Sequence, residues 1–155
     1  MKFSSREDIE APISYVFSKL SDVPAFERIA MRRGVKLRRI DRMSEIGVGA
    51  AWQFEFTFRG KQRSGRAQVT EFQSPERLKA DVMSDGMDGS TTIDLISLAP
   101  GRTRIMVALE IKPKSIAARV LVQSLRLSKA SLTKKYKARI ADYAEQIEEK
   151  YRSAV

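Results

Sequence analysis

The amino-acid sequence predicts an α+β fold, in which a curved antiparallel sheet of about seven strands carries two short helices and one long C-terminal helix. Residues 52–58 alternate strictly between aromatic and polar side chains, which is typical of a strand with one buried face. Residues 115–151 carry an apolar stripe at helical spacing. The strand-like segments follow one another through short turns, and short connections favour antiparallel pairing.

Composition is typical of a folded globular protein. The chain has 155 residues, of which 43% are hydrophobic and 31% charged, so we expect one domain over residues 1–155. No apolar segment approaches the roughly 20 residues that a membrane-spanning helix needs. Residues 1–8 lack the apolar centre of a secretory leader, and the chain has no cysteine, so we expect a cytoplasmic location.

The absence of histidine and cysteine limits the chemistry that the chain can perform. It excludes Ser-His-Asp catalysis, cysteine nucleophiles and the usual zinc sites. No two carboxylates have the spacing of a general acid and its base. We therefore expect neither metal nor cofactor, and the sequence favours binding over catalysis while leaving the question of an enzyme open.

The first helices are predicted from apolar spacing and from end signals. Residues 3–10 predict a strand, and Pro12 suits the first turn of a helix after it. Apolar residues then recur at i, i+3, i+4 and i+7, namely Ile13, Val16, Phe17 and Leu20. Asp22 can cap a second helix that ends at Gly34.

The middle of the chain predicts the remaining strands of the sheet. We expect them at residues 35–42, 52–58, 64–72, 77–84, 91–98 and 104–111. Turn residues separate these segments, including Gly60-Lys61 and Pro100-Gly101, while residues 85–89 predict a loop. The order of segments predicts a meander of neighbouring strands.

The C-terminal segment predicts a helix that is long for a domain of this size, about 55 Å if straight. Its stripe consists of Leu125, Leu132, Tyr136, Ile140, Tyr143 and Ile147. We expect a bend near Ser128 or Ser131. Ile116, Val120 and Leu127 lie on the side opposite Leu125, so the first half of the helix is apolar nearly all round.

The order of strand, two short helices, further strands and long helix resembles the helix-grip fold of the START-related, birch-pollen-allergen-like superfamily (SRPBCC). The resemblance covers essentially the whole chain. It rests on Ile9-Glu10-Ala11-Pro12-Ile13 with Val16-Phe17, on Ser21-Asp22-Val23-Pro24-Ala25-Phe26, and on Gly47-Val48-Gly49-Ala50-Ala51-Trp52. It implies a cavity between helix and sheet, in which family members bind lipids, sterols, polyketides, quinones or plant hormones. Some members are cyclases or dehydratases.

Such a cavity would be lined by the aromatic strand and by the inner faces of the last strands and helix. The candidate lining residues are Trp52, Phe54, Phe56, Phe58, Leu95, Val107, Leu125, Lys129, Leu132 and Tyr136. The four rings of the strand fill an ordinary core in the alternative interpretation. Lys129 with Tyr136 can bind an anionic head group, or Lys129 can extend to solvent at the cavity mouth.

The chain is strongly basic, with 29 lysines and arginines against 19 acidic residues and a net charge of +10. Residues 112–139 contain nine basic residues and no acidic one. This favours an anionic partner, such as an acidic membrane surface contacted through Ile116, Val120 and Leu127, or else a solvated charged face. Nucleic acid is disfavoured because the aromatic residues alternate inward, where they cannot stack on bases.

These observations together predict a protein that binds or transports an apolar or amphipathic small molecule, such as a lipid, a quinone or a polyketide-like compound. One alternative is a cyclase- or dehydratase-type enzyme in which Tyr136, Lys129 or Asp94 assists proton movement. The other is a basic adaptor for RNA or for an acidic membrane.

Overall fold

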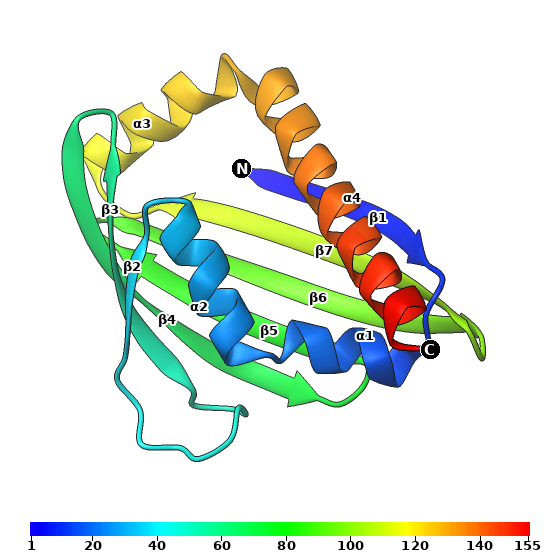
Figure 1. Ribbon diagram of the computed structural model, residues 1–155. Coiled ribbons are helices and arrows are strands. Elements are labelled where there is room, and N and C mark those ends of the chain that lie inside the picture. The colour runs from blue at the N-terminus through cyan, green and yellow to red at the C-terminus, as the bar shows by residue number, and fades with distance from the viewer.

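The computed structural model describes all residues from 1 to 155 (Figure 1). Its seven strands are β1 (Lys2–Ile9), β2 (Lys36–Arg39), β3 (Ala51–Phe58), β4 (Lys61–Gln73), β5 (Arg77–Ser84), β6 (Met87–Ala99) and β7 (Arg102–Pro113). Its helices are α1 (Ile13–Leu20), α2 (Val23–Arg32), α3 (Ile116–Arg126) and α4 (Lys129–Ala154). None of these helices combines the length and the apolar composition needed to cross a bilayer.

The strands form one antiparallel sheet in the order β1-β7-β6-β5-β4-β3-β2. Strands β2 to β7 are sequential neighbours, and β1 joins the far edge by pairing with β7. The sheet curves around the helices, which all lie on its concave side (Figure 1). The predicted α+β helix-grip architecture is therefore confirmed.

Strands β4, β6 and β7 are longer than the sequence predicts, and β6 begins earlier because the connection between β5 and β6 is a tight turn. Ser84 pairs with Met87, so only Asp85 and Gly86 remain of the loop expected at residues 85–89. Gly86 has φ +71°, a left-handed conformation that glycine adopts without a steric penalty. The turn lets β6 and β7 pair along their whole lengths.

The connection between β3 and β4 is a two-residue hairpin turn at Arg59 and Gly60, one position earlier than predicted. Both residues have positive φ, 52° and 73°, as in the turns that match the twist of antiparallel strands. Phe58 therefore faces Lys61 across the hairpin, and Phe56 faces Arg63. This register decides which side chains of β4 share a face with the aromatic residues.

The helix boundaries follow the local end signals. Asp22 caps α2, because its Oδ1 accepts a hydrogen bond from the Ala25 amide at 3.2 Å. Ser115 caps α3 through its Oγ, which accepts from the Ala118 amide at 3.1 Å. The C-terminal helix is interrupted at 127–128, which confirms the predicted bend and leaves α3 and α4 as separate helices.

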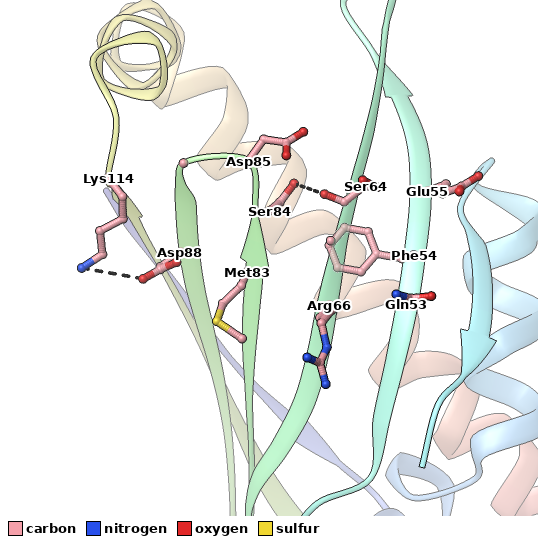
Figure 2. A pocket seen from close by; sticks show the side chains of 12 residues that line it. Gln53, Phe54, Glu55, Ser64, Arg66, Met83, Ser84, Asp85, Asp88 and Lys114 are labelled. Carbon is pink, nitrogen blue, oxygen red and sulfur yellow. Dashed lines mark hydrogen bonds and ion pairs between the residues drawn. The ribbon is translucent and has the colours of Figure 1, made fainter.

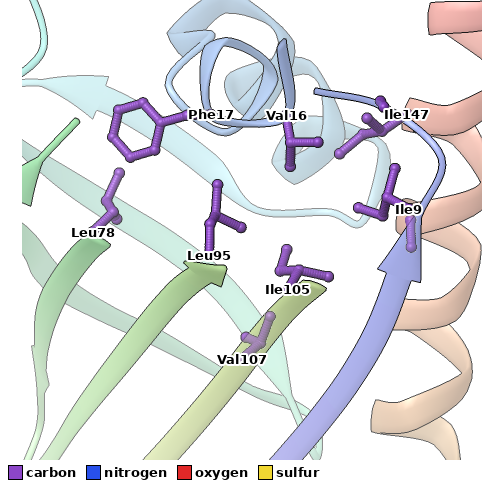
Figure 3. Packing of buried hydrophobic residues seen from close by; sticks show 10 residues of the cluster. Ile9, Val16, Phe17, Leu78, Leu95, Ile105, Val107 and Ile147 are labelled. Carbon is purple, nitrogen blue, oxygen red and sulfur yellow. The ribbon is translucent and has the colours of Figure 1, made fainter. Parts of the chain in front are cut away.

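The main core lies at one end of the sheet, under α1 and the last turns of α4 (Figure 3). It consists of Ile9, Ala11, Val16, Phe17, Leu78, Leu95, Ile105, Val107, Ala144 and Ile147. A second cluster, made of Ala50, Trp52 and Val69, lies near α2 and the start of β3. The outer half of β3 belongs to neither cluster.

Candidate functional site

The concave face of the sheet carries the aromatic residues of β3. Trp52, Phe54, Phe56 and Phe58 alternate with outward polar residues, so all four occupy the positions of β3 that face the helix side, and Phe54 also borders the depression shown in Figure 2. Trp52 is fixed at the inner end of this row. Its Nε1 lies 3.4 Å from the Glu27 carboxylate of α2, and its ring lies 6.0 Å from that of Phe26.

The rest of the concave face is only half buried. Its apolar members with intermediate exposure are Phe54, Phe56, Phe58, Ala67, Val82, Leu109 and Ile111. A compact monomer of 17.5 kDa exposes about 7,900 Å². This chain exposes 9824 Å², and the accessible apolar side chains of the concave face are part of that excess.

The helices leave this surface open because they pack along the margins of the sheet. Helix α4 lies along β1, α1 covers the ends of β6 and β7, and α2 contacts β2 (Figure 1). Helix α3 approaches β7 and buries only Ala118 and Val122. The middle of β3, β4 and β5 therefore lies away from the main helix contacts, which are with β1, β2, β6 and β7.

An arginine lies among the aromatic residues of this open surface. Arg63 is the cross-strand neighbour of Phe56, so its side chain is on the concave face. Its guanidinium carbon lies 5.6 Å from the centroid of the Phe58 ring, and that of Arg59 lies 5.5 Å from the same centroid. Arg63 forms no ion pair, and its Nε is buried without a hydrogen-bond partner.

Tyr136 of α4 presents a second unpaired polar atom on this side of the sheet. Its hydroxyl is buried and makes no hydrogen bond, and its ring packs 5.7 Å from the ring of Phe3 on β1. Burial raises the pKa of the Tyr136 phenol above its usual value. The hydroxyl therefore stays protonated at neutral pH and can donate a hydrogen bond.

The other residues expected to line a cavity lie in three different environments. Leu95 and Val107 are buried in the main core, where they pack under α1. Leu125 and Leu132 are half buried, one on each side of the break between α3 and α4. Lys129 is exposed at the first residue of α4, so its ammonium lies in solvent.

Asp94, one of the three residues considered for the enzyme alternative, faces away from these residues. Its neighbour Leu95 points into the core, so Asp94 is on the convex face. There Arg77 binds it at 2.9 Å and also binds Glu71 at 2.7 Å. No group of three or more acidic side chains is arranged to hold a metal ion.

Arg63 is not among the lining residues that the sequence predicts, although its inward position can be derived from the sequence. The signal lies in the hairpin register: a two-residue turn after Phe58 makes Lys61, Arg63 and Gly65 the inward positions of β4. A two-residue turn one position later, at Gly60-Lys61, would pair Phe58 with Arg63 and leave the arginine on the same face; only a loop longer or shorter by one residue would reverse the faces of the strand. The inward position of Arg63 therefore follows from the two-residue length of the turn.

The convex face bears a separate, shallow depression of about 590 Å³ (Figure 2). Cross-strand neighbours from four strands line it, including Gln53, Arg66, Met83 and Asp88. Lys114 lies 3.7 Å from Asp88 at its edge. Ten of its twelve lining residues are not hydrophobic, so it does not match the apolar cavity that the sequence predicts.

Solved structures share this fold. The chain superposes on the ZhuI aromatase/cyclase from Streptomyces sp. R1128 with a TM-score of 0.71 and 11% identity, covering 99% of this chain and 97% of that one. It superposes on a START superfamily protein from Mycobacterium smegmatis with a TM-score of 0.57 and 12% identity, covering 86% and 95%. For the protein Ara h 8.0201 the TM-score is 0.57 and the identity 12%, covering 92% and 98%.

These likenesses confirm the START-related, birch-pollen-allergen-like fold that the sequence motifs predict. No family model matches the sequence. No curated protein matches it at a significant level.

Proposed function

We propose that the protein binds an amphipathic small molecule on the concave face, with an anionic or carbonyl end held by Arg63. The observation that carries this proposal is the half-exposed row of Phe54, Phe56 and Phe58 beside the Arg63 guanidinium, which forms no ion pair and whose Nε has no hydrogen-bond partner. The fold supports the proposal, since proteins that resemble it bind hydrophobic small molecules between helix and sheet.

Burial of the apolar part of the ligand contributes a large but nonspecific gain in binding free energy. Removing about 300 Å² of apolar surface from water contributes roughly 7.5 kcal/mol. The loss of translational and rotational freedom on association costs about 4–15 kcal/mol. The entropy cost of association therefore nearly offsets the gain from apolar contact alone. A polar anchor then decides whether binding is tight.

Arg63 can supply that anchor. Its buried Nε–H lacks an acceptor, and such an unpaired buried donor costs about 1–3 kcal/mol. A ligand oxygen that accepts this hydrogen bond removes the cost. Because the guanidinium is planar and always charged, a carboxylate, a sulfonate or a phenolate is the best complement. Tyr136 offers a neutral donor elsewhere on the same side.

A matched pair of dyes tests the proposal. Anilinonaphthalene sulfonate and phenylnaphthylamine share one aromatic body, but only the first carries a negative charge. Affinities are measured by fluorescence for the wild type, for Arg63→Gln and for Arg66→Gln. Arg66 is the matched control, because it lies on the same strand and faces the convex side opposite Gln53.

We expect both dyes to bind the wild type. Arg63→Gln should weaken the affinity for the sulfonate dye by roughly tenfold or more, which is the effect of losing one charge-assisted hydrogen bond. The affinity for the neutral dye should not change. Arg66→Gln should change neither affinity. Equal effects of the two substitutions, or no binding of either dye by the wild type, would contradict the proposal.

A second variant tests the aromatic row independently of Arg63. Phe56→Asp places a carboxylate beside Arg63 and removes a ring, so uptake of both dyes should be lost. Circular dichroism checks that the variant is folded. A folded Phe56→Asp protein with wild-type affinity for both dyes would exclude this face as the site.

A further inference from the structure

The outward side of α3 carries three large apolar residues that no other part of the chain covers. Ile116 is 82% exposed, Val120 60% and Leu127, just after the helix, 91%. With 100° between successive residues, they form a narrow line along one side of the helix. Scattered exposed apolar residues are common on protein surfaces, but three large ones on one side of a single helix, with only the polar Gln123 between Val120 and Leu127, indicate an interaction site.

The position of α3 is set by its other side. Ala118 and Val122 are buried toward the sheet, and Ser115 fixes the first turn by capping it. Ser124 accepts a hydrogen bond at 2.9 Å from the Arg59 guanidinium at the tip of the β3–β4 hairpin. The apolar line therefore points outward on a helix that is attached to the body at several points.

Positive charge surrounds this line. Arg119 and Arg126 flank it on one side of the helix, and both are exposed. Arg59 and Lys61 of the hairpin tip add charge near Ser124, and Lys129 follows the helix. No acidic residue occurs between residues 112 and 139.

From this combination we propose that α3 docks the protein on an anionic lipid bilayer, with the helix lying in the interfacial plane. Lipid phosphates pair with Arg119 and Arg126, while Ile116, Val120 and Leu127 enter the acyl boundary. A second copy of the chain is a poorer partner, because apposed α3 surfaces would bring these arginines together in a protein of net charge +10. Docking goes beyond ligand binding and does not require it.

The chain offers a direct probe of this surface, because it contains no cysteine. A single Leu127→Cys substitution allows an environment-sensitive dye to be attached at that position alone. Leu98→Cys is the matched control, since Leu98 is an exposed apolar residue on β6, outside α3. The labelled proteins are mixed with vesicles of phosphatidylcholine alone or of phosphatidylcholine with phosphatidylglycerol.

We expect a blue shift of the dye at position 127 with the phosphatidylglycerol vesicles only, and no shift at position 98. No shift at 127, or equal shifts at both positions, would overturn the proposal. A shift at 127 that grows with protein concentration in the absence of vesicles would overturn it in favour of self-association.

The role of charge is tested by vesicle sedimentation. Arg119→Gln with Arg126→Gln should weaken binding to phosphatidylglycerol vesicles about thirtyfold, since each basic residue near an anionic surface contributes roughly a fivefold factor. The control pair is Lys150→Gln with Arg152→Gln, at the exposed end of α4. Equal weakening by both pairs would overturn docking through α3. The dye-pair experiment on Arg63 remains informative whichever result is obtained here.

Discussion

Phe54 and Gly65 face each other across the β3–β4 pair, and the Phe54 ring occupies the space that a side chain at position 65 would fill. A Cβ atom built on Gly65 would lie 2.5 Å from Cζ of Phe54, far inside van der Waals contact. The Phe54 ring therefore packs against the backbone of β4. This arrangement depends on glycine at position 65.

Gly65→Ala should therefore destabilise the protein and displace the Phe54 ring. The Met83 carbonyl also stands against the new methyl group, so the backbone cannot simply yield. We expect a loss of about 1–3 kcal/mol in the free energy of unfolding, the usual cost of overpacking. Urea denaturation measures it, with Gly89→Ala as control, because a Cβ there meets its nearest atom at 3.5 Å. Equal costs for the two variants would contradict this account.

Asp41 should make stability depend on pH in the acid range. The hydrogen bond from Arg39, followed by that from the Ala51 amide, holds the pKa of Asp41 well below its usual value of 3.8. A carboxyl with a lowered pKa stabilises the fold above its unfolded pKa, and this contribution is lost as the pH falls through the folded pKa.

We therefore expect Asp41→Asn to be less stable than the wild type at neutral pH, with a difference that narrows below about pH 4. Urea titrations over a pH series measure it. Asp85→Asn is the control, since Asp85 is exposed and makes no side-chain hydrogen bond. A difference between wild type and Asp41→Asn that stayed constant down to acid unfolding would argue against the role of Asp41.

Tyr143 should limit stability at alkaline pH. Burial, with a smaller contribution from the charge of Asp22, raises the pKa of Tyr143 to about 12 from a usual value of 10.0. A group with a raised pKa contributes stability that is complete below the unfolded pKa and is lost as the pH rises through the folded pKa.

Between pH 10 and 12 the wild type should therefore lose stability that Tyr143→Phe retains. Tyrosinate absorbance should show one phenol fewer ionising near pH 12 in the variant. Identical ionisation curves for the two proteins would show that Tyr143 is not the late-titrating residue.

One buried and one exposed isoleucine provide a test of how the core and α3 pack. Ile105 is 1% exposed in the main core, so Ile105→Ala should cost about 2–5 kcal/mol of stability. Ile116 is 82% exposed, and Ile116→Ala should stay within about 0.5 kcal/mol of the wild type. A large cost at Ile116 would mean that α3 packs its outward side against the protein and is not available for docking.

The sequence predicts most of the fold because its strongest signals are local. The alternation from Trp52 to Phe58 defines β3 and its faces, and the cap at Asp22 with the break near Ser128 defines helix ends. Strand lengths were less predictable, since β6 and β7 extend through mutual pairing rather than through their own composition.

The candidate site was predictable only in part, because it depends on register and on helix position. The two-residue length of the hairpin turn places Arg63 on the same face as Phe56. Leu95 and Val107 lie on the expected face, but α1 covers them, which no periodicity reveals. The exposure of Leu127 likewise follows from where α3 leaves the sheet.

If Arg63 holds the polar end of a ligand on the concave face, the side-chain Nε–H signal of Arg63 in an ¹⁵N NMR spectrum should respond to the ligand. Its loss in Arg63→Gln assigns the signal, and Arg66→Gln assigns the control signal from the opposite face. We expect saturating anilinonaphthalene sulfonate to shift the Arg63 signal and to leave that of Arg66 in place. An unmoved Arg63 signal at saturation, or a larger shift at Arg66, would contradict this role of Arg63.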